Sequence, residues 1–494
     1  MTIRTVRRRM TLWTAAALCL PAMLCAQTLT LDAAVQTALA KNERISQYEE
    51  RLKQKEYGNR EAWGNFLPSL NFTASYTHLK EPMKIDLEPV RQAIITMQAG
   101  TQTEFANVYS MMQGRPALTQ AQRDALNAQN FKALDARLPL FVEEMKKQDY
   151  KTGTFVATQP LFLGGKLLAA RQYAASEMRS AGIELERAKN EIVQEALVNY
   201  LAVVLMTDVV RTREDVLAGM NRHDTQAKKL FAEGLIANHQ VMRAEVAVAD
   251  AERNLIDDRN RLELARIALR ATLGLPSDAP VEVLETLSYR RTGDTLEACE
   301  AQALVRNPVM QVLAEKREAA SANYNLQRSE FLPQIAAFGK YEVYPQYLSI
   351  LEPRWAVGVQ LSMNLFSGMK KYAKLESASH LEREVEYLEA DTKKKIGLLV
   401  NKDYRELDNA RSRYERLKKN IRLSEENLRL MRNRFETGLG TSLDVIDAEL
   451  VLEKNLIESK TSLFDYYKAM ADLYTAVGEP EKFLSIWNAK GEEQ

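Results

Sequence analysis

The fold of this chain is decided by the stretch Phe435-Glu-Thr-Gly-Leu-Gly-Thr-Ser-Leu-Asp-Val-Ile-Asp447. Apolar residues lead into it at steps of three, four or seven, the spacing of a packed helix seam: Leu417, Ile421, Leu428, Met431 and Phe435. Gly438 and Gly440 then end that helix, because glycine adopts positive φ at little cost. Thr441 and Asp444 have the spacing of a capping box, which begins a new helix. The stretch is therefore a turn between two long helices.

The turn has a counterpart 204 residues earlier (435 − 231), in Phe231-Ala-Glu-Gly-Leu-Ile-Ala-Asn-His-Gln240. Other pairs repeat as well. Phe66-Leu-Pro68 returns as Phe331-Leu-Pro333 at an offset of 265, and Leu161-Phe162 returns as Leu365-Phe366 at an offset of 204. The chain is therefore a tandem duplication, and the 61-residue difference between the two offsets predicts an insertion in the first repeat.

Each repeat contains a predicted β-hairpin. Apolar residues at 70, 72, 74 and 76 alternate with polar ones, and a second strand covers about 152–162. The same alternation returns over 335–343 and 355–365. These strands have the length of membrane-spanning β-strands. The alternative is a soluble antiparallel hairpin packed on a core.

Long helices fill most of the remaining sequence. No proline occurs between Pro160 and Pro276, nor between Pro353 and Pro480. A continuous helix from Leu167 to Phe231 would measure about 98 Å, far longer than an ordinary globular helix. A returning helix is expected to end near Leu273. A shorter helix is predicted from Leu31 to about Trp63, and its repeat begins at Leu296.

The predicted organisation has four parts. Residues 1–26 are a signal peptide and 27–285 the first repeat, made of a helix, a β-hairpin with a long inserted loop at 80–150, and a long helix pair. Residues 286–480 are the second repeat, and 481–494 form a short tail. The segment is interpreted as a long loop with some helix, because it follows neither period for long and contains prolines at 82, 89, 116 and 139. We expect it at the cell surface; the alternative is a plug inside the lumen.

The first residues have the pattern of an export signal. Arg4, Arg7, Arg8 and Arg9 precede a short apolar run, and Ala26 suits a cleavage site. A membrane anchor and lipidation of Cys25 are the alternatives. The strongest later apolar run, Leu197 to Val210, is interrupted by Asn199 and Asp208.

The composition argues against several classes of function. Removing the four signal arginines from 67 basic residues leaves 63 against 66 acidic ones, interspersed, which is unlike a nucleic-acid-binding protein. Cys299 is the one cysteine outside the signal, so no disulfide is expected within the mature chain. Four single histidines lack the spacing of a metal site, and no phosphate loop is present. We therefore expect no enzyme, no cofactor and no metal.

The strands indicate how many copies assemble. Four spanning strands per chain cannot close a pore, which needs about eight or more. An open sheet edge in lipid leaves backbone groups unpaired at prohibitive cost. Several chains must therefore pool their strands, and three chains, giving twelve strands, are favoured.

The chain resembles the TolC-like outer membrane efflux protein family. The resemblance is carried by the duplication, the Phe-Leu-Pro entries to the strands, the exits Gln159-Pro-Leu-Phe-Leu-Gly-Gly165 and Met363-Asn-Leu-Phe-Ser-Gly368, and the Phe-x-x-Gly-Leu turns. It implies a mainly α fold with a small β part: a homotrimer with a 12-stranded β-barrel among outer membrane lipids and a periplasmic barrel of antiparallel coiled-coil helices. It also implies a passive channel for efflux or type I secretion, working with a periplasmic adaptor and an inner-membrane pump of RND or ABC type.

The resemblance also implies roles for particular residues. The two turns, with Gly234, Leu235, Gly438 and Leu439, would dock the adaptor. Asp444 and Asp447 match the Asp-x-x-Asp pair that lines the periplasmic entrance in the best-known members, although Asp444 also fits a simple capping role. Gly440 stands where some members have an arginine, and Gln240 replaces an acid of the first turn. The rival function is a periplasmic coiled-coil structural or adaptor protein, which would explain the helices but not the strand pairs.

Overall fold

The computed structural model describes residues 29–283, 285–349 and 351–489, so the predicted signal peptide at 1–26 and Cys25 lie outside the described residues. The chain divides into two compact units. Among the described residues, the helical unit contains 29–57, Ala175–Ala319 and 382–489, whereas the strand unit contains Gly58–Ala174 and Ala320–Leu381. Each unit takes segments from both sequence repeats, because the long helices run from one unit into the other.

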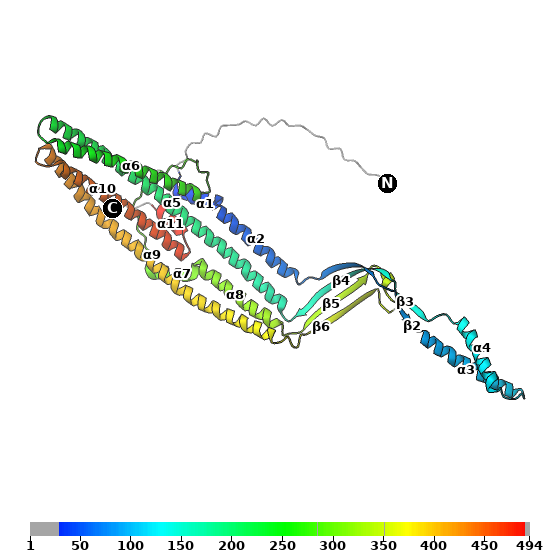
Figure 1. Cartoon of the computed structure of the whole chain (residues 1–494). Helices are drawn as coiled ribbons and strands as arrows, with labels where there is room; N and C mark the ends of the chain where they lie inside the picture. The colour runs from blue at the N-terminus through cyan, green and yellow to red at the C-terminus, as the bar shows by residue number, and fades with distance from the viewer. Residues whose placement is uncertain (1–28, 284, 350, 490–494) are drawn as a thin grey trace, which may run out of the picture. The chain divides into compact units, whose positions relative to one another are not determined.

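The two repeats form corresponding helices (Figure 1). The first repeat contributes α1 (Leu31–Lys41), α2 (Glu43–Gly64), α5 (Lys166–Ala232) and α6 (Asn238–Thr272). The second contributes α7 (Leu296–Arg306), α8 (Pro308–Ser329), α9 (Lys370–Glu436) and α10 (Ser442–Val477), followed by α11 (Glu481–Asn488). Helices α5 and α9 each contain 67 residues, which agrees with the uninterrupted helices predicted from the proline-free runs.

A break that the sequence pattern did not reveal divides the first helix of each repeat. The Asn42 side chain accepts a hydrogen bond from the Arg44 N–H (3.0 Å) and donates one to the Thr272 carbonyl at the end of α6 (2.9 Å). In the second repeat Asn307 makes the equivalent bonds to Val309 and to Ala476 at the end of α10. One asparagine thus begins one helix and caps another, and the duplication extends to these hydrogen bonds.

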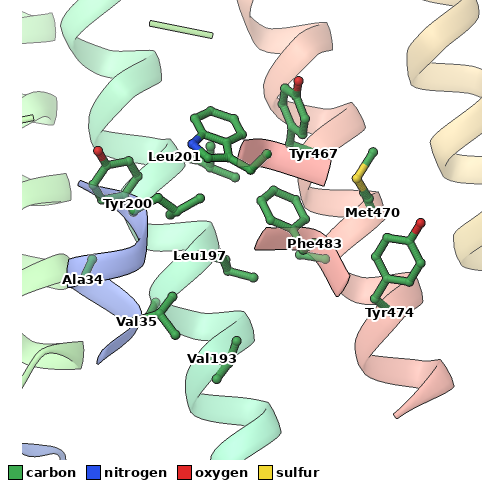
Figure 2. Close-up of a cluster of buried hydrophobic side chains, with 14 of the residues drawn as sticks. Ala34, Val35, Val193, Leu197, Tyr200, Leu201, Tyr467, Met470, Tyr474 and Phe483 are labelled. Atoms are coloured by element: carbon green, nitrogen blue, oxygen red, sulfur yellow. The ribbon is translucent and has the colours of Figure 1, made fainter. Parts of the chain in front are cut away.

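The main core of the helical unit lies where α1, α5, α10 and α11 meet (Figure 2). Leu201 of α5 lies on the side of Tyr467 and Phe483, whereas Tyr200 lies beside α1 and donates to the Leu29 carbonyl (2.8 Å); all four side chains are fully buried. By length and composition α5 contains a window apolar enough to cross a membrane, but 61% of that window is buried inside the protein. We therefore interpret this apolar run as core.

The strand unit contains a four-stranded antiparallel sheet in the order β1-β4-β5-β6. Its strands are β1 (Ser69–His78), β4 (Asp149–Leu163), β5 (Gln334–Glu342) and β6 (Trp355–Ser362), as the alternating patterns predicted. Phe72 lies opposite Phe155, Phe155 opposite Tyr341, and Tyr341 opposite Trp355. One row of aromatic side chains therefore crosses all four strands.

The insertion at 80–150 is more ordered than the long loop with some helix that we expected. It contains a two-stranded ribbon, β2 (Met83–Asp86) with β3 (Val142–Lys146), and two helices, α3 (Glu88–Met112) and α4 (Gln120–Arg137). The prolines mark element boundaries rather than disorder. Pro89 is in the first turn of α3, Pro116 lies between the helices and Pro139 follows α4.

The expected tail at 481–494 also begins with an ordered element. Helix α11 is only eight residues long, too short for its periodicity to be recognised in sequence. Phe483 and Trp487 lie one turn apart on it, stack on each other, and each contacts Tyr467 of α10 edge-on. Residues 481–488 therefore belong to the core of the helical unit.

Candidate functional site at the helix turns

The turns between α5 and α6 and between α9 and α10 have the same backbone geometry. Gly234 and Gly438 both adopt positive φ, at 76° and 73°. The Leu235 N–H donates to the Leu230 carbonyl, and the Leu439 N–H donates to the Arg434 carbonyl, each at 2.8 Å. These are helix C-caps of the Schellman type, in which the left-handed residue is a glycine. Leu235 and Leu439 follow the glycines and expose 63% and 74% of their surface.

A small apolar cluster joins the two turns. Its buried members come from all four helices that meet there: Ala227, Leu230, Val241, Ala244, Leu428, Phe435, Val445 and Ala448. Phe435 is almost fully buried and lies against the ring of His223, with ring centroids 4.6 Å apart. The cluster fixes one turn relative to the other within the helical unit.

Hydrogen bonds at Ser442 add a polar connection between the repeats. The Ser442 N–H, at the start of α10, donates to the side-chain oxygen of Gln240 in α6 (3.1 Å). The Ser442 hydroxyl lies 2.7 Å from Nε2 of His223 in α5. Burial, reinforced by the nearby Arg432 guanidinium, lowers the pKa of His223 to about 4, so the ring is neutral at neutral pH. Gln240 and His223 of the first repeat thus both bind Ser442 of the second turn through uncharged groups.

Buried ion pairs continue this connection along the helices. The Arg213 guanidinium of α5 lies 2.7 Å from Asp258 of α6 and 2.5 Å from Glu453 of α10. Further along α5, Asp208 pairs with Lys460 at 3.2 Å. Because a buried charge that loses its partner is costly, separating the two helix pairs here would require those charges to be solvated.

Another buried carboxylate lies nearer to the turns. Glu449 of α10 pairs with Arg432 of α9 beside Gly219. A Cβ at position 219 would lie 2.8 Å from the Glu449 carboxylate, so the glycine leaves room for it. Burial raises the pKa of Glu449, and Arg432 opposes that rise.

Asp444 and Asp447 are both exposed on the first turns of α10. Asp444 completes the predicted capping box: its carboxylate accepts from the N–H and the hydroxyl of Thr441, both at 2.8 Å. These bonds lower the pKa of Asp444. Asp447 is outside the cap, so its exposed carboxylate has no such structural role in helix initiation.

An apolar groove of about 620 Å³ lies beside the same turns. Helices α5, α6 and α10 line it, with Met220, Val246, Ile446 and Leu450 among its side chains. Val246 exposes 62% of its surface and Leu450 about half, so the groove is an uncovered apolar surface of the single chain.

The predicted site residues thus lie at one end of the helical unit, around one cluster. The sequence interpretation missed the buried polar residues His223 and Asp258. A signal was present, because His223 continues the seam of Val216, Met220 and Ala227, and Asp258 continues that of Leu255 and Leu262. A polar residue at a seam position is a candidate buried contact. Within residues 29–283, 285–349 and 351–489, no group of three or more His, Cys, Asp or Glu could hold a metal ion.

Comparison with known proteins agrees with this architecture. The chain matches the outer membrane efflux protein family over residues 34–275 and 301–479. The alkaline protease secretion protein AprF of Pseudomonas aeruginosa is 23% identical over 237 residues, or 46% of this chain and 47% of AprF. The outer membrane protein TolC of Vibrio cholerae is 26% identical over 215 residues, or 42% of this chain and 47% of TolC. The matched region spans about half the length of each relative.

The fold is similar to that of a solved outer membrane protein. The crystal structure of VceC from Vibrio cholerae superposes with a TM-score of 0.69 at 19% identity, covering 91% of this chain and 96% of VceC. This likeness extends over both helices and strands, and the family match covers most of both sequence repeats. The chain therefore belongs to the outer membrane efflux protein family.

Proposed function

We propose that three copies of this chain form one passive channel across the outer membrane, as the exit duct of a tripartite efflux or type I secretion system. The observation that carries the proposal is the open sheet. Strands β1 and β6 each pair on one side only within the described sheet, so both edges are left with unpaired backbone groups. In lipid such edges must be paired, and a neighbouring copy offers the complementary edge.

As a member of this family the chain is an outer membrane protein, and its helical part extends into the periplasm. The surface of β6 suits that environment. Trp355, Val357, Val359 and Leu361 alternate along it, and each exposes more than 60% of its surface. Nothing within the described chain covers this apolar face, and a β-barrel strand presents such a face to lipid.

In this proposal the partner pump selects the transported substrate, and the channel contributes no chemical site of its own. Members of this family are channels and not enzymes. AprF is named for protease secretion, whereas the family is named for efflux, so both export routes fit a duct of this kind. The pump would be of RND or ABC type, reached through a periplasmic adaptor.

The turns are the proposed adaptor-docking surface, with Gly234, Leu235, Gly438 and Leu439. The two leucines support the proposal, because they are large, apolar and more than half exposed beside rigid C-caps. Burying such apolar side chains against a protein partner is more favourable than leaving them in water, and the fixed backbone presents them for that contact.

Asp444 and Asp447 are the proposed periplasmic gate. In a trimer the pair would supply six carboxylates around one axis, which attract cations and repel anions. The test is single-channel conductance in a planar bilayer with divalent cations on the periplasmic side. Divalent block should disappear in Asp444→Ala/Asp447→Ala and weaken in Asp447→Asn, which leaves the capping box intact. Asp391→Asn, in an exposed carboxylate of α9, is the control; equal block in all variants excludes the pair.

The channel itself is tested by fractionation followed by conductance. The protein should remain in the outer membrane until detergent is added, and the purified protein should give discrete conductance steps. Release as a soluble periplasmic protein, as a coiled-coil adaptor would behave, contradicts the proposal.

A further inference from the structure

Helix α3 of the insertion carries an apolar stripe that no residue of the described chain covers. The stripe consists of residues at steps of four and three: Val90, Ile94, Met97, Thr101, Phe105, Val108 and Met112. At 3.6 residues per turn these positions fall within roughly 80° of one another around the helix. Met97, Phe105 and Met112 expose 67%, 72% and 81% of their surface. Only Thr101 interrupts the apolar character.

The opposite face of α3 packs on α4 through polar groups. Arg91 is 3% exposed and binds the Leu138 carbonyl (2.9 Å) and the Asp135 carboxylate (2.8 Å). Asn130 of α4 donates to the buried Thr103 hydroxyl (3.1 Å), and buried Asn107 accepts from the Leu118 N–H. Ile95 and Ala99 are the buried apolar residues on this side of α3, and α4 buries none. The hairpin thus buries several polar groups between its helices, and the larger apolar residues of α3 lie outside, whereas Leu126, Phe131 and Leu134 of α4 are partly buried.

This arrangement favours a protein occupant for the stripe rather than a lipid surface. Helices that lie on membranes carry exposed lysine or arginine on their polar face. The charged residues of α3 are Glu88, Arg91 and Glu104, and its one cation is buried and paired. An uncharged stripe with steps of three and four is the seam of a coiled coil, in which like helices pack side by side.

The attachment point of the insertion identifies the partner as another copy of the chain. The insertion follows β1 directly, and β1 is an edge strand of the sheet. If copies pair edge to edge, the chain leaves the sheet at the boundary between copies. Cyclic symmetry then gives every copy the same orientation toward the common axis, so a stripe that faces the axis in one copy faces it in all. We propose that the α3 stripes of the three copies pack on one another as a parallel coiled coil, an inference that rests on the trimeric channel proposed above.

Cysteine crosslinking in the full-length, membrane-inserted protein tests this contact. Met97→Cys and Val108→Cys place a thiol on the stripe, and Thr96→Cys places one on an exposed position of the same helix away from it. Cys299 is buried and is common to all variants. Under mild oxidation each stripe variant should give roughly tenfold more disulfide-linked dimer than Thr96→Cys, because seam positions bring equivalent Cβ atoms within disulfide range.

The same samples separate failure of this contact from failure of the channel proposal. Native mass spectrometry reports the number of copies independently of the disulfide. A trimer in which both stripe variants crosslink no more than Thr96→Cys overturns the α3 contact and leaves the channel intact. Rapid labelling of Met97→Cys by a membrane-impermeant maleimide on intact cells would likewise show an open stripe. A monomeric parent protein overturns both proposals.

Discussion

Two glycines hold the ends of the returning helices against the short N-terminal helices of each repeat. Gly274 follows α6 and Gly478 follows α10, with φ of 62° and 94°. A Cβ at these positions would lie 2.6 Å from the Lys41 carbonyl and 2.5 Å from the Arg306 carbonyl, respectively. Positive φ and close backbone contact therefore act together at equivalent places in the duplication.

Replacing Gly478 should destabilise the helical unit. In Gly478→Ala both the left-handed backbone and the contact with Arg306 become strained, and we expect a loss of about 1–3 kcal/mol in the free energy of unfolding. Gly293→Ala is the control, because Gly293 has no positive φ and open space around its Cα. Thermal unfolding of the detergent-solubilised protein measures both variants. Equal midpoints for the two would show that the Gly478 contact relaxes freely.

His223 should make stability depend on pH. Its pKa in the folded protein is about 4, against an ordinary value of 6.5, so between these values the unfolded chain binds a proton that the folded chain does not. The contribution of neutral His223 to the free energy of unfolding is fully present above pH 6.5 and is lost as the pH falls toward 4. Between pH 7 and 5 the parent should lose about 2 kcal/mol that His223→Gln retains.

The comparison between parent and variant isolates this effect. Burial raises the pKa of Asp403 to about 6, which stabilises the fold on acidification and opposes the effect of His223. Asp403 is present in both proteins and cancels in the difference. Parallel curves of unfolding midpoint against pH for parent and variant would exclude His223 as the titrating group.

Among single residues, the sequence could predict those with a local signature. Thr441 and Asp444 form their capping box because both partners lie within one turn of the chain. The bond from the Asn42 side chain to the Thr272 carbonyl joins residues 230 positions apart, and no local rule anticipates it. Once this bond is known, however, the offsets of the duplication predict the equivalent bond from the Asn307 side chain to the Ala476 carbonyl.

At the scale of elements, each turn combines a rigid C-cap with an exposed leucine. Adaptor docking can therefore be tested by changing the leucines, without straining the backbone at the glycines. Among the described residues, Met369 is the only non-glycine residue with positive φ. Leu235 and Leu439 therefore have ordinary φ angles, and replacing either leucine with arginine introduces no backbone strain. Leu235→Arg/Leu439→Arg should abolish export while the trimer and its membrane insertion persist, because charge replaces the apolar contact.

A matched variant controls for the added charge. Leu423→Arg changes an exposed leucine of α9 that is remote from the turn. Export of a pump substrate and the amount of detergent-extracted trimer are measured for all proteins. Undiminished export by the double variant would remove the turns from the docking surface.

The elements that the sequence predicted well are the long ones. Proline-free runs and strand alternation identified α5, α9 and the four strands of the main sheet, because their periodicity is sustained. For the insertion the sequence predicted some helix but not the bounds of α3 and α4, since the packing of these helices also uses polar contacts of Arg91, Asn107 and Asn130 that periodicity does not show. Helix α11 was missed because eight residues are too few to show a helical periodicity, although Phe483 and Trp487 both pack on Tyr467 of α10.

At the scale of the whole molecule, the chain exposes backbone groups and apolar surfaces that a single copy cannot pair or cover. The sheet has two open edges, β6 has an uncovered apolar face, and the groove beside the turns is lined by exposed Val246 and Leu450. In the proposed channel, a membrane and neighbouring copies would together satisfy all three features. Such surfaces are typical of a chain that folds as part of a closed oligomer.

The number of copies in the membrane-extracted protein tests this account most directly. Native mass spectrometry of the detergent-solubilised species that conducts in planar bilayers should give the mass of three mature chains, because four strands per copy must then close a twelve-stranded barrel. A conducting species with the mass of a single chain would contradict the account.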